Sequence, residues 1–335
     1  MKMKKQLGLT LVELMISITI GLLIMAGVFQ LYLTATQTQR SQEATSRIQE
    51  NMRYLFSRLE ADITQTGYFG CIPYQGGTGD DSLIQVHLIK DITTKYDFSN
   101  LLGGEDGSGL RKSDILRTRF FSASAQLQVQ SPGMASVSSP VPLLESEPLY
   151  KELKKGDVVM VSDCSFADVF MITNDPANDG LIHHDNTTAV DGQANLYTSL
   201  QREYGKSNVV TGSTAYLFSG KSSAVEWRIQ TSASGVDAKV DCSDTARQYC
   251  ALFRNGEEMA EGVEDFQLTY GWRNAAGNLI VNTADKVTDW NAVDRVFVAL
   301  TLNSVQTAPT LDGSKYATKE VNKVFMLRNQ LPGEI

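Results

Sequence analysis

The sequence predicts an α+β protein in which one long N-terminal α-helix packs on a β-rich globular domain. Three observations lead to this prediction: an apolar run near the N-terminus, a helical pattern of apolar residues directly after it, and many short apolar segments separated by turn residues in the remainder of the 335-residue chain. They divide the chain into a basic leader, an apolar helix, an amphipathic continuation and a globular domain, at residues 1–8, 9–33, 34–66 and 67–335.

The apolar run over residues 9–33 is long enough to cross a membrane. A helix rises about 1.5 Å per residue, so this run spans the ~30 Å hydrocarbon core. A secretory signal peptide has only ~7–15 apolar residues before a small-residue cleavage site, whereas polar, helix-compatible sequence follows this run. Lys2, Lys4 and Lys5 precede it, and the positive-inside rule places them in the cytoplasm. The remainder of the chain is therefore expected on the other side of a single span.

A second helical pattern follows the membrane segment. Apolar residues recur every three or four positions while charged residues occupy other faces, which is typical of an amphipathic helix with one side on a core. Gly67 is a suitable stop, so one helix is expected from about residue 9 to residue 66. Its apolar stripe consists of Ile48, Met52, Leu55, Leu59 and Ile63.

The rest of the chain has the pattern of a single β-rich domain. Several segments alternate apolar and polar residues, as residues 225–229 do (VEWRI). Gly, Ser, Asn and Asp crowd residues 75–82, 99–113, 131–140 and 174–195, which we expect to be surface loops. The candidate strands are residues 83–89, 114–122, 157–162, 168–173, 214–218, 224–230, 249–254, 265–272, 278–282, 295–303 and 321–328.

Four cysteines lie beyond the membrane segment, and an even number in an oxidising compartment indicates two disulfides. Four cysteines allow three pairings. Cys242 and Cys250 enclose a short local loop and are the preferred first pair, which leaves Cys71 with Cys164. The alternative is a metal site, but no Cys-x-x-Cys spacing occurs, and the adjacent histidines at 183–184 are the only soft ligands nearby.

The composition and motifs favour neither a nucleic-acid binder nor an enzyme. A net charge of −8 lacks the basic footprint that phosphate contact needs. No Gly-x-Ser-x-Gly, phosphate-binding loop or His-Glu-x-x-His motif is present. The segment around Asp175, Asn178 and Asp179 has the composition of a calcium loop, but Pro176 interrupts it and the ligand offsets do not match, so a polar turn is expected. The acidic run over residues 257–265 is interpreted as a solvated face. No cofactor or metal is expected.

Glu13 lies inside the apolar run, where a carboxylate costs roughly 2.5–3.5 kcal/mol on insertion scales. One interpretation is that Glu13 sits at the cytoplasmic headgroups and is hydrated there. The other is that Glu13 pairs with a positive charge in an assembled state. A cut after Gly8 would create such a charge, the new N-terminal amine of a neighbouring chain.

Residues 8–15, GLTLVELM, resemble the class III signal of type IV prepilins and type II secretion pseudopilins. The resemblance implies that prepilin peptidase cuts between Gly8 and Leu9, N-methylates Leu9, and leaves Glu13 to serve assembly. The family usually has Phe at the position of Leu9. It also implies a type IV pilin-like fold, inserted in the inner membrane with the globular domain in the periplasm, and later incorporated in a pilus.

Further segments resemble the PilW family of minor type IV pilins: GYFGC, GDVVMVSDCSFADVFMIT, AEGVEDFQLTYG and residues 321–329. This resemblance implies assembly with other minor pilins and the major pilin on the inner-membrane assembly platform, a role in priming the pilus, and a place at the tip with a large adhesin, for adhesion and twitching motility. Two alternatives stay open. One is a J-type pseudopilin of type II secretion, and the other is a membrane-tethered periplasmic binding domain.

Overall fold

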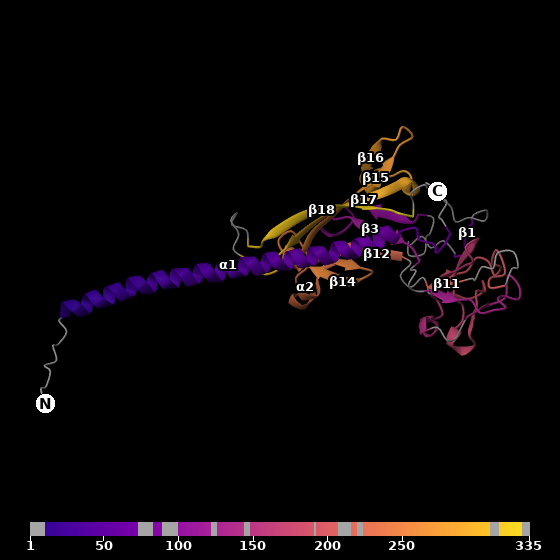
Figure 1. Ribbon diagram of the computed structural model, residues 1–335, viewed down its shortest axis with the longest axis horizontal. Coiled ribbons are helices and arrows are strands. Elements are labelled where there is room, and N and C mark those ends of the chain that lie inside the picture. The colour runs from indigo at the N-terminus through magenta and orange to yellow at the C-terminus, as the bar shows by residue number, and fades with distance from the viewer. Residues whose placement is uncertain are drawn as a thin grey trace, which may run out of the picture.

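The longest element is one continuous helix, α1, Leu11–Gln65, which projects from the globular part as a stem (Figure 1). The globular part has two lobes, one wrapped around the second half of α1 and one beyond the C-terminal end of this helix. The computed structural model describes residues 11–72, 83–88, 100–121, 126–143, 148–190, 192–206, 216–219, 224–308 and 315–329.

Two antiparallel sheets and the second half of α1 form the helix-covered lobe. The first sheet has the strand order β14-β13-β12-β3-β2 and the second β16-β15-β17-β18. The helix contacts β18, β17, β14 and β3, and the apolar side chains of all these elements share one core. The strands are β2 Leu102–Glu105, β3 Ile115–Arg119, β12 Ala224–Thr231, β13 Cys250–Arg254, β14 Glu257–Glu261, β15 Val263–Arg273, β16 Leu279–Asn282, β17 Val293–Asn303 and β18 Thr318–Met326.

The alternation in the sequence explains how these strands face the core. In β12, Val225, Trp227 and Ile229 are buried and the residues between them are only half-buried, as expected for a strand with one face on a core. The same alternation occurs in β15 and β17, which pair along nearly their whole length. The resulting sheets present one apolar face each to α1.

The second lobe, which we call the distal lobe, is built on a sheet of order β1-β7-β6-β11-β4. All five residues of β6 are buried, and so are those of β7. Val159 and Val161 belong to the core on one face of this sheet, and Val158 and Met160 to the core on the other. A continuous apolar run, rather than an alternating one, is typical of such a strand. The strands are β1 Ile84–Val86, β4 Gln126–Gln128, β6 Val158–Ser162, β7 Ala167–Met171 and β11 Tyr216–Ser219.

Short elements complete the structure, and some lie where the sequence predicted loops. Strand β2 falls within the predicted loop over residues 99–113, because two glycines hide its pattern. Gly104 allows the hydroxyl of Tyr270 to come so close that a Cβ atom would collide with it. The other short elements are β5 Val141–Pro142, β8 Leu181–Ile182, β9 Ala189–Val190, β10 Gln193–Ala194, α2 Ala233–Ala238, and the 3-10 helices Leu110–Lys112, Pro148–Glu152, Pro176–Asn178, Arg247–Tyr249, Ala284–Lys286 and Trp290–Ala292.

Candidate assembly site

The first part of α1, residues 11–43, is not covered by the globular lobes, and we call it the bare part. No residue from Leu11 to Glu43 is buried, and the large apolar side chains range from 75% exposed at Leu11 to 43% at Leu33. Ala44 is the first residue of the helix that the helix-covered lobe buries. By length and composition, α1 is the one helix among the described residues that qualifies as a membrane span. A bare apolar surface of this length is stable only in a lipid or protein environment.

The serine and threonine hydroxyl groups from Ser17 to Thr38 are satisfied within the helix itself. Ser17 donates to the backbone carbonyl of Glu13 at 2.7 Å, and Thr19 donates to that of Met15 at 3.0 Å. In a bilayer each unsatisfied polar group costs several kcal/mol, so such internal hydrogen bonds suit a membrane helix.

Glu13 is the single charged residue between Leu11 and Gln39, and it lies in the first turn of α1. A carboxylate at this end is favoured by the helix dipole. The predicted processing residues, Gly8 and Leu9, lie outside the described residues. The structure therefore places Glu13 at the start of a bare apolar stem, and in sequence it lies five residues after Gly8.

Comparison with known families bears on this end of the chain. The profile described as the prokaryotic N-terminal methylation motif matches residues 3–29. The chain carries a type IV pilin-like class III signal. This signal includes Gly8, Leu9 and Glu13, and it implies processing by prepilin peptidase and membrane assembly with pilins. Neither the search of curated proteins nor the search of solved structures found a match.

The second half of the signal-bearing helix is fixed to the globular part by a buried carboxylate. Asp62, 5% exposed, accepts hydrogen bonds from Arg254 Nε at 2.8 Å, from Arg254 Nη2 at 2.9 Å and from Trp227 Nε1 at 2.8 Å. The bond to Asp62 is the main cause that raises the pKa of Arg254. Because Trp227 and Arg254 belong to neighbouring strands, these bonds set the rotation of α1 about its axis.

Sequence analysis missed Asp62, although a signal was present. The residue lies between Leu59 and Ile63 on the apolar stripe, where a charged side chain must find a partner. At the end of the helix, the Asn329 side chain donates to the carbonyls of Thr66, Thr64 and Gln65, at 3.1 to 3.4 Å. This contact satisfies carbonyls that a helix end leaves without partners.

Both disulfides are present in the structure, with the pairing preferred from the sequence. Cys71 bonds Cys164, 93 residues away, and Cys242 bonds Cys250, eight residues away. The first joins the segment after α1 to the turn between β6 and β7 of the distal lobe. The described residues contain no free cysteine.

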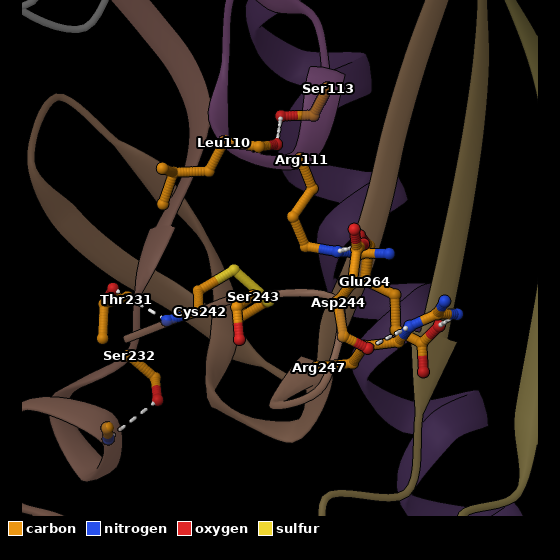
Figure 2. Close-up of a disulfide and its surroundings, with 12 residues drawn as sticks. Leu110, Arg111, Ser113, Thr231, Ser232, Cys242, Ser243, Asp244, Arg247 and Glu264 are labelled. Atoms are coloured by element: carbon orange, nitrogen blue, oxygen red, sulfur yellow. Dashed lines mark hydrogen bonds and ion pairs between the residues drawn. A yellow bond between two sulfur atoms is a disulfide. The ribbon is translucent and has the colours of Figure 1, made fainter. Parts of the chain in front are cut away.

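The Cys242–Cys250 bond closes a loop that is held by charged neighbours (Figure 2). The carboxylate of Asp244 accepts from Arg111 Nε at 2.9 Å, and the carboxylate of Glu264 accepts from Arg247 at 3.3 Å. Cys242 N donates to Thr231 Oγ1 at 3.1 Å. These contacts tie the loop to β12 and β15.

The sequence suggested that the acidic run over residues 257–265 is one solvated face, and the structure shows that this interpretation is wrong. It forms β14 and the start of β15, and Glu264 is 5% exposed, bonded to Asn303 and Arg247. The Glu258 carboxylate accepts from Ala233 N at 2.7 Å, at the N-terminus of α2. The pattern missed this because carboxylates that cap a helix resemble surface carboxylates in sequence.

In the candidate calcium loop, the carboxylates accept hydrogen bonds from backbone N–H groups of the loop itself. Asp175 accepts from Ala177 N at 3.4 Å, and Asp179 accepts from Leu181 N at 3.1 Å. His183 contacts the other oxygen of Asp179, while His184 is buried against Phe170. These contacts are those of a polar turn.

Proposed function

We propose that the protein is a minor type IV pilin of the PilW kind. It is a subunit of an assembly and not an enzyme. Prepilin peptidase removes residues 1–8 in the inner membrane and methylates Leu9, with the globular lobes in the periplasm. The stem then leaves the bilayer to pack against the stems of other minor pilins and the major pilin. The resulting complex primes the pilus and stands at its tip.

One observation carries this proposal: a methylation motif opens a bare stem in which Glu13, near its beginning, is the single charged residue between Leu11 and Gln39. A helix that served only to hold a binding domain in the membrane would have no need of a carboxylate inside the hydrocarbon, where it is costly. In an assembly, the carboxylate gains a charge-assisted bond to the new N-terminal amine of a neighbour, which is stronger than a neutral hydrogen bond.

Intact mass and N-terminal sequencing of the protein from cells test the processing step. The mature chain should begin at N-methylated Leu9 and have 335 − 8 = 327 residues. Gly8→Val should remain unprocessed, because its side chain obstructs the peptidase site. Gly21→Val is the matched control, since a Cβ at Gly21 meets nothing within 4 Å. If the wild-type protein in pili still begins at Met1, the proposal is wrong.

A second measurement separates the pilus from the secretion system. A strain that lacks this protein should lose surface pili and twitching while it continues to secrete folded enzymes. The reverse outcome would identify a J-type pseudopilin, and an unprocessed chain that binds a ligand would identify a tethered binding domain.

A further inference from the structure

A notch lies where α1 emerges from the helix-covered lobe toward its bare part. Its volume is about 510 Å³, within the range of ligand pockets. One wall is α1 and the other is the segment that follows β17 at Asn303. The lining residues are Arg40, Glu43, Ala44, Arg47, Ser304, Gln306 and Thr307.

The notch has a surplus of positive charge. Arg40 and Arg47 lie two helical turns apart on one face of α1, and both are exposed. Among the residues that the structure describes, neither guanidinium has an ion-pair or hydrogen-bond partner. Glu43, the one acidic residue of the lining, accepts a hydrogen bond from Gln39 at 3.3 Å. Two guanidinium groups beside two hydroxyl groups and an amide are suited to a carboxylate or a phosphate.

The distance from the membrane decides between these two ligands. If the hydrocarbon core ends near Leu33, Arg40 lies about 10 Å and Arg47 about 21 Å farther along the helix. The headgroup layer is only roughly 5–8 Å thick on each side. The notch is therefore above the lipid phosphates, at the height where the stems of other membrane-anchored subunits stand parallel to α1.

We propose that this notch binds a carboxylate on the extramembrane half of a neighbouring subunit's stem helix. The inference rests on the proposed function, because it needs a second stem standing in the same membrane. Arg40 and Arg47 form bidentate ion pairs with an Asp or Glu of that stem. The notch sets the height and the rotation of the neighbour before the apolar stems pack.

The test uses the full chain in its own cells, with a photo-crosslinking amino acid at Gln306. We expect a crosslink to a peptide from the extramembrane half of another stem helix that carries Asp or Glu. Combined Arg40→Glu and Arg47→Glu should lower the crosslink yield at least fivefold. Arg53→Glu reverses one guanidinium charge, half of the change in the double variant, at an exposed residue of α1 outside the notch, and should leave the yield unchanged.

A charge swap makes the test specific. Changing the crosslinked acidic residue of the partner to Lys should restore at least half of the yield in the double variant. A crosslink to phospholipid, an unchanged yield in the double variant, or equal loss with Arg53→Glu would overturn the inference. Thermal melting of each variant shows that the globular lobes remain folded.

Failure of this inference is distinguishable from failure of the proposed function. Cleavage after Gly8 and presence in sheared pili are measured in every strain. A processed wild-type chain that enters pili, with a double variant that crosslinks equally well, refutes the notch alone. An unprocessed wild-type chain refutes the proposed function and this inference with it.

Discussion

The two parts of α1 differ in burial although they form one unbroken helix. From Leu11 to Glu43 no residue is buried, whereas from Ala44 onward an apolar stripe is covered by two sheets. The covered part is stabilised by the chain's own core, and the bare part has to be stabilised by lipid or by other chains. The fold therefore accounts for the stability of the covered part alone, and the bare part depends on its surroundings.

The carboxylates of the two parts, Asp62 and Glu13, differ in their surroundings in the same way. Asp62 in the covered part is buried with a bidentate guanidinium and an indole N–H, all from the same chain. Glu13 in the bare part is the single charged residue between Leu11 and Gln39. Removing the Asp62 carboxylate should therefore lower the stability of the folded domain. Removing the Glu13 carboxylate should lower only the incorporation of the protein into an assembly. The predictions below test this contrast, from the largest expected effect on domain stability to the smallest.

Asp62→Ala should have the largest effect on the unfolding free energy of the globular part. Breaking one side of a buried ion pair typically costs about 3–5 kcal/mol, and the Trp227 N–H also loses its acceptor. Denaturant titration of the full chain in detergent measures this change. Glu60→Ala is the control, because the Glu60–Lys323 pair is exposed and such pairs contribute little. Equal losses for the two variants would show that Asp62 does not anchor the helix.

The two disulfides should differ in their contribution. In the chain-entropy account, a bond stabilises more as its loop lengthens, by about 4.5 kcal/mol for a loop near 100 residues and about 2.5 for one near eight. Cys71→Ser with Cys164→Ser, which opens the loop of 93 residues, should therefore cost more than Cys242→Ser with Cys250→Ser, which opens the loop of eight. Chemical denaturation without reductant compares them. The opposite order would mean that native-state contacts, such as those of Arg247, outweigh loop closure.

The distal lobe, beyond the end of α1, should show a pH dependence of its own. Burial lowers the pKa of His184 below the ordinary 6.5, and the nearby His87 acts in the same direction while Asp168 opposes it. The unfolded chain therefore takes up a proton at higher pH than the folded chain. Stability from His184 is fully present above pH 6.5 and is lost as the pH falls below it, by at most about 1.4 kcal/mol per pH unit.

Melting curves between pH 7.5 and 5 measure this effect. His184→Asn should flatten the dependence, whereas His183→Asn, a change at the neighbouring and more exposed histidine, should not. The dependence should also persist in Asp62→Ala, since that variant alters the helix-covered lobe. An equal slope in the His184 variant would place the titration elsewhere.

Local sequence patterns predicted the helix and most strands, because these elements depend on residues that are close together in the sequence. The stripe from Ile48 to Ile63 recurs every three or four positions and so predicts the helix, and the alternation of apolar and polar residues in later segments predicts the β-rich part.

 The partners of Asp62 were not readable, because Trp227 and Arg254 are 165 and 192 residues away along the chain. The notch at Arg40 and Arg47 likewise exists only because the segment after β17 returns to α1. Contacts between distant segments are set by tertiary packing, which periodicity does not report.

The smallest effect on stability, and the most informative for assembly, is expected from Glu13→Ala. None of the described residues of the globular lobes buries this part of α1, so the melting temperature of the domain should not change. If Glu13 is merely hydrated at the headgroups, the variant should enter the membrane as well as the wild type or better, because a costly carboxylate is gone. It should then also enter pili normally.

If Glu13 instead bonds the new amine of a neighbouring stem, the variant should be cut after Gly8 as usual but be depleted from sheared pili relative to the membrane pool. The amine would lose its charged partner in a medium of low dielectric, where an uncompensated charge is most costly. Ser17→Ala is the matched control, one turn along α1, because its hydroxyl bonds only the helix backbone. Equal incorporation of Glu13→Ala and wild type, at equal processing, would remove the assembly role of this residue and leave the bare stem held by apolar packing alone.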